Sequence, residues 1–171
     1  MPWKICYPRW AFLMNEIIVG IADAKTAHDH QVLVTYALGS CVGICLYETN
    51  RKLAGMVHIL LPTQVGYLHM ENAYKFADSG ITRLIDRMIT LGADKKKIIA
   101  KIAGGAEMFQ TLETKTDIGM RNIAAVKNTL HLHHIPLIAE DTGSTYGRSI
   151  WFSSSDGSLK IKTVKHGIQI I

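Results

Sequence analysis

The sequence is poor in the features that mark disulfide-rich, zinc-binding or membrane-spanning proteins. Its 171 residues include only three cysteines, Cys6, Cys41 and Cys45, which form neither a disulfide framework nor a CxxC zinc pair. No stretch approaches the roughly 20 apolar residues of a membrane span. A secretory signal is not indicated either, because Asn15 and Glu16 interrupt the first apolar run. These absences predict a protein of the reducing cytoplasm without membrane insertion.

Charged residues are also scarce, at 19% of the chain against 48% hydrophobic residues, and this balance predicts a globular protein. The length suits one domain, and no repeat or low-complexity linker divides it. We expect residues 1–14 to be an extension, with Met14 as an alternative start, and residues 15–171 to be a single monomeric domain. The net charge of +5 favours an acidic partner surface. Nucleic acid is not expected, because no aromatic residues or known motif accompany the basic run 95–97.

Residues 35–62 predict a β-hairpin, because the polar segment 48–52 separates two apolar runs. A two-residue turn at Thr49 and Asn50 would place Cys41 directly opposite His58. A loop over residues 49–52 would place these two side chains diagonally on one face. A register shifted by one residue would put them on opposite faces. The segment lacks the Asn-Gly or Asp-Gly that fixes a turn type, so the register stays open.

A cysteine beside a histidine is a pairing used in nucleophilic catalysis, because the imidazole helps to produce the thiolate at neutral pH. Thr35, on the strand that leads to Cys41, is a candidate acceptor for the imidazole N–H. Gly39 and Ser40 predict a bend that lifts Cys41 from the sheet and leaves backbone N–H groups free as an oxyanion hole. The structural alternative is that such a cysteine is a buried small hydrophobe and the histidine a core residue. Cys45, which lacks the bend, is assigned to the core.

Other polar residues are grouped in ways that resemble metal or acid–base sites. Histidines occur in the loop 28–30 and in the segment 131–134 that ends the second predicted helix. A metal site needs three or four convergent ligands, so a solvated loop and cations at a helix C-terminus explain these histidines better. Glu140 and Asp141 point to opposite faces of a strand, and we expect them to bind loop backbone or Arg148. No metal ion and no organic cofactor is expected.

The periodicity of apolar residues predicts the fold class. An apolar stripe over residues 76–91 predicts a helix that ends at Gly92, and a second helix begins at residue 116 or 117. Roughly seven or eight apolar runs predict strands. One ends at residues 104–105, where glycine permits a sharp turn or a close backbone approach, and Trp151 points inward in another. We predict an α+β domain with strands in packed or mixed sheets built from hairpins and two main helices on one side. Strand and helix do not alternate regularly, so a doubly wound nucleotide fold is not expected.

Four segments resemble the CheD family of chemoreceptor glutamine deamidases. They are Thr35–Cys41, Gly55–Pro62, Ala100–Phe109 and Ala139–Gly143, which occur in the order of the family. The resemblance extends from about Glu16 to Val164, and its most specific parts are the Cys-to-His spacing and the Ala-Gly-Gly-Ala-x-Met-Phe segment. Two positions depart from the family pattern. Ala37 stands where glycine is frequent, and Ser144 stands where a second glycine is common.

The resemblance implies an enzyme that hydrolyses glutamine side-chain amides of methyl-accepting chemotaxis receptors to glutamate and releases ammonia. It implies that Cys41 is the nucleophile, His58 the acid and base, and Thr35 the group that orients His58. It also implies binding to a CheC phosphatase, for which Phe109 is a candidate anchor. Two alternatives stay open: a non-catalytic receptor-docking module that stimulates a CheC-type phosphatase, and a receptor methylesterase that uses the same triad.

Overall fold

The computed structural model describes residues 15–66, 72–107 and 117–171. Within these ranges the chain forms ten strands and two long helices, which confirms the α+β class. The strands are β1 (Glu16–Ile18), β2 (Asp23–Ala27), β3 (Val32–Leu38), β4 (Val42–Glu48), β5 (Leu53–Ile59), β6 (Ile98–Gly104), β7 (Leu137–Thr142), β8 (Arg148–Ser153), β9 (Leu159–Thr163) and β10 (Gly167–Ile170). The helices are α1 (Ala77–Thr90), α2 (Ile118–Leu132) and the short 3-10 helices η2 (Ala73–Lys75) and η3 (Lys95–Lys97).

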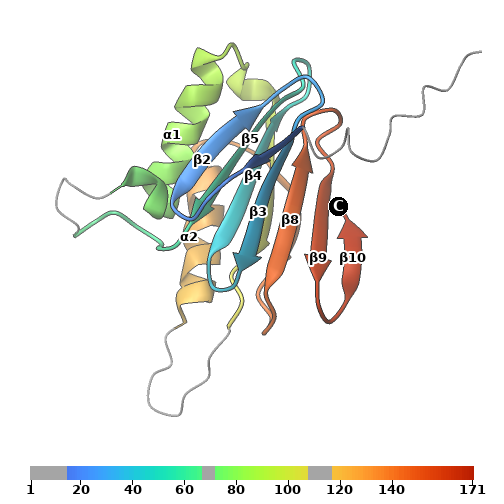
Figure 1. Ribbon diagram of the computed structural model, residues 1–171. Coiled ribbons are helices and arrows are strands. Elements are labelled where there is room, and N and C mark those ends of the chain that lie inside the picture. The colour runs from blue at the N-terminus through green and yellow to red at the C-terminus, as the bar shows by residue number, and fades with distance from the viewer. Residues whose placement is uncertain (1–14, 67–71, 108–116) are drawn as a thin grey trace, which may run out of the picture.

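The strands form two mixed sheets that pack face to face. Sheet A has the order β1-β3-β8-β9-β10, and sheet B has the order β2-β5-β4-β6-β7. The pairs β1–β3 and β6–β7 are parallel, and the other pairs are antiparallel. Both helices cover one face of sheet B, and sheet A covers the other face (Figure 1). The predicted arrangement of mixed sheets with two helices on one side is therefore confirmed.

The predicted hairpin is formed by β4 and β5 at the centre of sheet B. Val42 pairs with Ile59 and Glu48 with Leu53, so the connecting loop spans residues 49–52. This is the diagonal register, one of the two that place residues 41 and 58 on one face. Every residue of both strands is buried, because the hairpin lies between two apolar layers. That double burial explains why each strand is a nearly continuous apolar run.

Two hydrophobic clusters lie on the two faces of sheet B. The cluster on the helix side includes Ile44, Leu46, Val57, Ile59, Ile81, Leu84, Ile85, Met88, Val126 and Leu130. The cluster between the sheets includes Leu33, Leu38, Cys45, Met56, Ile150, Phe152 and Ile161. Cys45 is fully buried in this second cluster, which confirms its assignment to the core.

Helix α1 follows the predicted apolar stripe and stops just before Gly92, as expected. Helix α2 begins after Asp117, whose side chain makes no capping hydrogen bond; Thr116 lies outside the described residues. The prediction of seven or eight strands was too low, because β2 and β10 were not recognised. Strand β2 consists of Asp-Ala-Lys-Thr-Ala, which reads as part of a polar loop. Strand β10 consists of Gly-Ile-Gln-Ile and is exposed along its whole length, so its short apolar alternation does not mark a buried face.

The predicted inward orientation of Trp151 is wrong. Strand β8 pairs with β3 so that Ile150 lies opposite Thr35, and the buried residues of β8 are Arg148, Ile150 and Phe152. Because side chains alternate along a strand, Trp151 lies on the outer face of sheet A. There its ring contacts Tyr36 edge-on at 5.9 Å, and the Lys160 ammonium lies 4.5 Å from the ring centre.

Candidate functional site

A hydrogen bond between Thr35 and His58 joins the two sheets. Thr35 is on β3 of sheet A and His58 is on β5 of sheet B, and each is 1% exposed. Thr35 Oγ1 lies 2.9 Å from His58 Nδ1 and 2.7 Å from the carbonyl oxygen of Val19. The hydroxyl donates its only hydrogen to that carbonyl, so it accepts from the imidazole. His58 Nδ1 therefore carries the ring hydrogen, and Nε2 has a free lone pair in the neutral ring.

The free nitrogen of His58 is buried and unpaired. Nε2 has no hydrogen-bond partner among the described residues. Burial lowers the pKa of His58 to about 4, because the charged ring loses its hydration. At neutral pH the ring is therefore a neutral base, and its basic nitrogen is available for a proton from another group.

Cys41 lies in the bend that carries the chain from sheet A into sheet B. Gly43 is paired directly with His58 across the hairpin, and Cys41 precedes Gly43 by two residues. The half-buried side chain of Cys41 packs against the cluster between the sheets, the layer into which His58 also points. The arrangement matches the diagonal placement on one face, and diagonal neighbours across a hairpin lie roughly 7–8 Å apart.

The ionisation of Cys41 differs from the activated thiolate expected from sequence. Burial raises the pKa of the Cys41 thiol, and its own backbone N–H acts in the opposite direction with a smaller effect. With His58 also neutral, the resting pair is a thiol and an imidazole. A thiolate forms only when the imidazole takes the proton.

Gly43, the strand partner of His58, lets the two sheets approach closely beside this pair, and it is not among the residues predicted from the sequence. A Cβ atom at position 43 would lie 2.8 Å from Ile150 Cδ1 and 3.2 Å from Leu38 Cδ1. Both of those side chains belong to the cluster between the sheets. A larger residue would therefore push sheet A away from the β4–β5 hairpin.

The Gly-Gly turn after β6 supports the bend at residues 39–41. Gly104 and Gly105 have φ angles of +115° and +69°, which confirms the predicted sharp turn. Gly105 N–H donates to the carbonyl of Cys41 at 2.7 Å, and Ala106 N–H donates to the carbonyl of Gly39 at 2.8 Å. A Cβ atom at position 104 would overlap the Cys41 carbonyl oxygen. Glycine is thus required here for a close approach to the cysteine backbone.

Asn122 holds the remaining carbonyl of the bend, and it is a residue that the sequence analysis missed. Its side chain extends from α2 and is completely buried. Nδ2 donates to the carbonyl of Ser40 at 2.9 Å and to the carbonyl of Leu60, just after β5, at 2.8 Å. The carbonyls of residues 39, 40 and 41 are therefore all bound on the side of β6 and α2.

The carboxylates of Glu140 and Asp141 are engaged separately. Asp141 forms an ion pair of 2.8 Å with Arg148, which confirms one of the two expected partners. Glu140 instead pairs with Lys127 on α2 at 2.7 Å. The two adjacent side chains point to different neighbours, as alternation along β7 requires.

The histidines considered as metal ligands have other contacts. His28 Nδ1 lies 2.7 Å from Asp29 Oδ2, and His30 Nδ1 lies 2.8 Å from Ser155 Oγ. His133 Nε2 lies 2.9 Å from Thr82 Oγ1. In the part of the chain that the structure describes, no three side chains of His, Cys, Asp or Glu are grouped to hold a metal ion. Phe109, the candidate partner-binding residue, lies outside the described residues.

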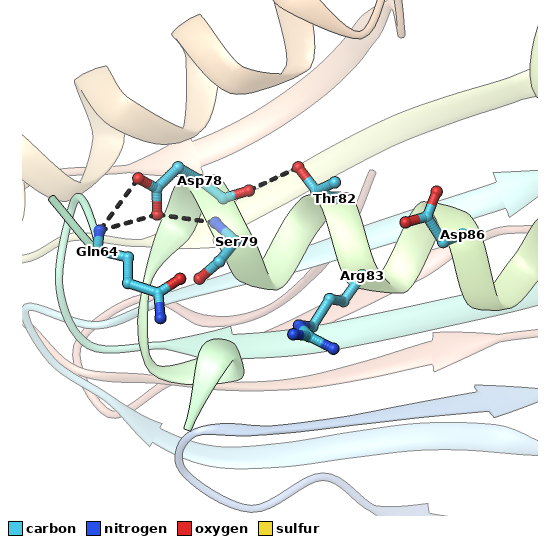
Figure 2. Close-up of a pocket in the computed structure, with 6 residues that line it drawn as sticks. All are labelled: Gln64, Asp78, Ser79, Thr82, Arg83 and Asp86. Carbon is cyan, nitrogen blue, oxygen red and sulfur yellow. Dashed lines mark hydrogen bonds between the residues drawn. The ribbon is translucent and has the colours of Figure 1, made fainter. Parts of the chain in front are cut away.

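A separate surface pocket lies along α1 and does not include the cysteine or the histidine. Figure 2 shows its lining residues, which are Gln64, Asp78, Ser79, Thr82, Arg83 and Asp86. The Asp78 carboxylate accepts hydrogen bonds from Thr63 Oγ1 at 2.7 Å and from the Gln64 N–H at 3.0 Å. These contacts hold the preceding loop against the start of α1, so the carboxylate has a structural role.

Comparison with known proteins identifies relatives along nearly the whole chain. The CheD family model, described as chemotactic sensory transduction, matches residues 60–163. A protein of Caldanaerobacter subterraneus subsp. tengcongensis, named "Probable chemoreceptor glutamine deamidase CheD", is 48% identical over 155 residues, which are 90% of this chain and 96% of that protein. A protein of Syntrophomonas wolfei with the same name is 46% identical over 162 residues, which are 92% of this chain and 100% of that protein.

Among solved structures, the crystal structure of the hypothetical protein YfiH from Bacillus licheniformis matches with a TM-score of 0.43 and 14% identity. The match covers 72% of this chain and 51% of that chain. This similarity is too low to indicate the fold or the function of this chain.

Proposed function

The chain belongs to the CheD family, and on that premise we propose that it hydrolyses glutamine side-chain amides of chemoreceptors to glutamate and ammonia, with Cys41 as nucleophile. Relatives that are 44–48% identical carry the name chemoreceptor glutamine deamidase. The family match begins at residue 60, after the cysteine and the histidine. The proposed roles of single residues therefore rest on geometry. The observation that carries them is the bond between Thr35 and His58, which leaves Nε2 basic.

In the proposed first step, the sulfur of Cys41 attacks the amide carbon Cδ of the substrate glutamine. A C–S bond forms while the thiol proton moves to His58 Nε2, and the carbonyl oxygen becomes an oxyanion. His58 then donates this proton to the amide nitrogen, the C–N bond breaks and ammonia leaves. General acid–base catalysis by one imidazole thus serves both proton transfers. Thr35 keeps Nδ1 protonated throughout and stabilises the imidazolium by accepting its hydrogen bond.

In the second step, water hydrolyses the thioester. His58 Nε2 takes a proton from the attacking water, and a C–O bond forms at Cδ. The C–S bond then breaks, the sulfur regains a proton from His58, and glutamate is released. The reaction consumes one water per amide and returns the enzyme to its neutral thiol and imidazole, so it requires no cofactor.

The bend at residues 39–41 is the proposed oxyanion hole. A trans peptide directs its C=O and N–H groups to opposite sides. The carbonyls of Gly39 and Ser40 are bound on the side of β6 and α2. The N–H groups of Ser40 and Cys41 therefore point away from that side, and the Cys41 N–H is close enough to its own sulfur to affect the thiol pKa. Such N–H groups stabilise a developing oxyanion.

The test is turnover of a purified receptor fragment by a Cys41→Ala variant, with Cys45→Ala as the matched control. Peptide mass spectrometry reads deamidation as a gain of one dalton at a glutamine. We expect Cys41→Ala to show no gain and Cys45→Ala to retain activity, because Cys45 is enclosed in the core. Normal turnover by Cys41→Ala would falsify the proposal. Loss of a methyl group in place of the one-dalton gain would instead indicate a methylesterase.

Alkylation of the thiol does not separate the enzyme from a docking module. Burial raises the pKa of the Cys41 thiol, so slow labelling by iodoacetamide at neutral pH is expected even for a catalytic cysteine. Turnover is the measurement that distinguishes the two functions.

The proposal includes association with a CheC-type phosphatase and a monomeric, cytoplasmic domain over residues 15–171. Support for CheC comes from the family resemblance, and its candidate anchor Phe109 lies outside the described residues. No helix within the described ranges is long and apolar enough to cross a membrane. Light scattering of the purified protein, alone and mixed with a CheC-type phosphatase, measures both the oligomeric state and the association.

A further inference from the structure

Asn122 is a buried polar residue that binds the bend before β4 and the residue just after β5. It projects from the second turn of α2 and is 0% exposed. Its Nδ2 donates to the carbonyls of Ser40 and Leu60, which are 82 and 62 residues away in the chain. Both partners only accept hydrogen bonds, so they fix the orientation of the side-chain amide.

These two carbonyls flank the reacting side chains. Ser40 immediately precedes Cys41, and Leu60 follows His58 by two residues. The paired register of β4 begins only at Val42, so the hairpin ladder does not hold Cys41 itself. The position of the cysteine depends instead on the three bound carbonyls of the bend. Two of these are held by backbone N–H groups, and the third is held by the Asn122 side chain.

We infer that Asn122 is a positioning residue that sets the distance between the Cys41 sulfur and His58 Nε2. The inference rests on the proposed deamidase function. One amide group binds the backbone next to the nucleophile and the backbone near the base. It therefore holds these two backbone segments at a fixed distance from each other. Proton transfer between sulfur and nitrogen requires hydrogen-bond distance, and displacement by a fraction of that distance slows the reaction.

A second observation separates this role from simple packing. Asn122 Oδ1 is buried and has no hydrogen-bond partner among the described residues. An unpaired buried acceptor lowers stability, and an apolar side chain would fill the same place on α2 without that cost. Unpaired buried polar groups in native proteins call for a functional explanation. The two bonds from Nδ2 to the backbone beside Cys41 and His58 provide it.

The test compares Asn122→Asp and Asn122→Ala with Thr129→Val in the full chain. Asn122→Asp keeps the shape but replaces the donor by an acceptor that faces two carbonyls. Thr129→Val removes a buried hydroxyl that donates to the Ala125 carbonyl at 2.8 Å on the same helix, away from the bend. We measure kcat and KM for receptor deamidation, the pH profile of kcat, and the thermal midpoint of each variant.

We expect the kcat of both Asn122 variants to fall about 100-fold, which is the loss that a misplacement of reacting groups by about 1 Å can cause. The KM should change less than about threefold. Thr129→Val should keep wild-type kcat at a comparable loss of thermal stability. The pH profile of kcat should also shift in the Asn122 variants, because the sulfur and imidazole no longer share the proton in the same geometry. Labelling of Cys41 by iodoacetamide, followed at the peptide level, should change in rate while Cys45 stays protected.

Wild-type kcat in a folded Asn122 variant would overturn the inference. So would failure of both Asn122 variants to fold while Thr129→Val folds, because Asn122 would then be a stability residue. The proposed function fails separately, by turnover in Cys41→Ala. An inactive Cys41→Ala variant combined with fully active Asn122 variants therefore contradicts this inference alone.

Discussion

The contact of Thr35 with His58 shows how one side chain determines the chemistry of another. The Thr35 hydroxyl donates to the Val19 carbonyl and accepts from Nδ1, which fixes the tautomer of the ring. Burial of the ring lowers the pKa of His58 to about 4 and so keeps it neutral. The tautomer and the ionisation state thus have separate causes, and both leave the lone pair of Nε2 free.

The lowered pKa of His58 predicts an acid-labile fold. The pKa is about 4 in the folded chain and about 6.5 in the unfolded chain. Above pH 6.5 both states are neutral and no stability is lost. As the pH falls from 6.5 to 4, the unfolded state binds the proton first. The free energy of unfolding therefore decreases by about 3 kcal/mol by pH 4. Urea unfolding at pH 7 and pH 4 measures this loss.

A His58→Gln variant is the control for this pH dependence, since glutamine does not titrate. Between pH 7 and pH 4 the variant should lose about 3 kcal/mol less unfolding free energy than the wild type loses. An equal fall in both proteins would show that His58 is not the group responsible.

At the residue scale, the sequence singled out Cys41, His58 and Thr35 as candidates, and the structure brings Thr35 and His58 into contact. The sequence did not single out Asn122 or Gly43. Glycine 43 lies inside an apolar run and reads as an ordinary strand position. Asn122 lies between an arginine and an isoleucine, yet it precedes Val126 by four residues and so falls on the buried face of α2. That spacing is a usable signal, because a polar residue on an apolar stripe needs a partner.

Strand β3 contains an irregularity directly before the bend at residues 39–41. Its pairing with β8 shifts between Thr35 and Leu38, which marks a β-bulge. Within the bulge Ala37 has a φ angle of +57°, and Ser144 in the adjacent loop has +65°. These are the two positions where the family pattern has glycine. The departures from the pattern therefore place ordinary residues in left-handed backbone, where they are strained.

We expect Ala37→Gly to stabilise the protein by up to about 1 kcal/mol, because glycine relieves the left-handed strain and offsets its larger unfolded entropy. Ala139→Gly in β7 is the matched control and should lose about 0.5–1 kcal/mol, since alanine at that position has an ordinary φ. Chemical denaturation of the two variants and the wild type measures both changes. A destabilised Ala37→Gly variant would mean that the bulge is not strained.

At the element scale, the register of the β4–β5 hairpin could not be read from the sequence. The segment 48–52 lacks the Asn-Gly or Asp-Gly that selects a two-residue turn. The structure has a four-residue loop in which Lys52 takes a positive φ of +53°, a position without a sequence signal. Only the observed pairing of Val42 with Ile59 shows that Cys41 and His58 lie on the same face of the hairpin.

On the scale of the whole molecule, a buried ion pair connects the two sheets. Arg148 on β8 of sheet A binds Asp141 on β7 of sheet B at 2.8 Å, and the arginine side chain is 0% exposed. Arg148 also donates to the carbonyls of Gly143 and Tyr146 at 3.0 and 3.1 Å. Gln169 on β10 binds the other oxygen of Asp141. This network holds the loop 143–147 next to the Gly-Gly turn.

We expect Asp141→Asn to destabilise the protein by about 3 kcal/mol, because it leaves the Arg148 charge buried without a counterion. The neighbouring Glu140→Gln variant is the control. Its ion pair with Lys127 is exposed, with side chains 37% and 44% accessible, and should be worth less than about 1 kcal/mol. Thermal unfolding of both variants compares them, and similar losses would contradict the assignment of Arg148 as the essential buried cation.

The overall class of the fold followed from the apolar periodicity, but the division of strands between two sheets did not. Strands β3 and β4 are separated by only three residues, yet they belong to different sheets. Sequence neighbours usually pair, so this crossover is not the default expectation. The same crossover explains the error at Trp151, since inward and outward faces of β8 are defined only once sheet B is known to cover sheet A.

The crossover also has an evolutionary consequence. Thr35 belongs to sheet A and His58 to sheet B, and residues 39–41 carry the chain from one to the other. On the proposed mechanism, a shortened paralogue that kept Cys41 and His58 but lost residues 16–38 would have an imidazole without its hydroxyl partner. We therefore expect selection to retain that segment together with the cysteine and the histidine.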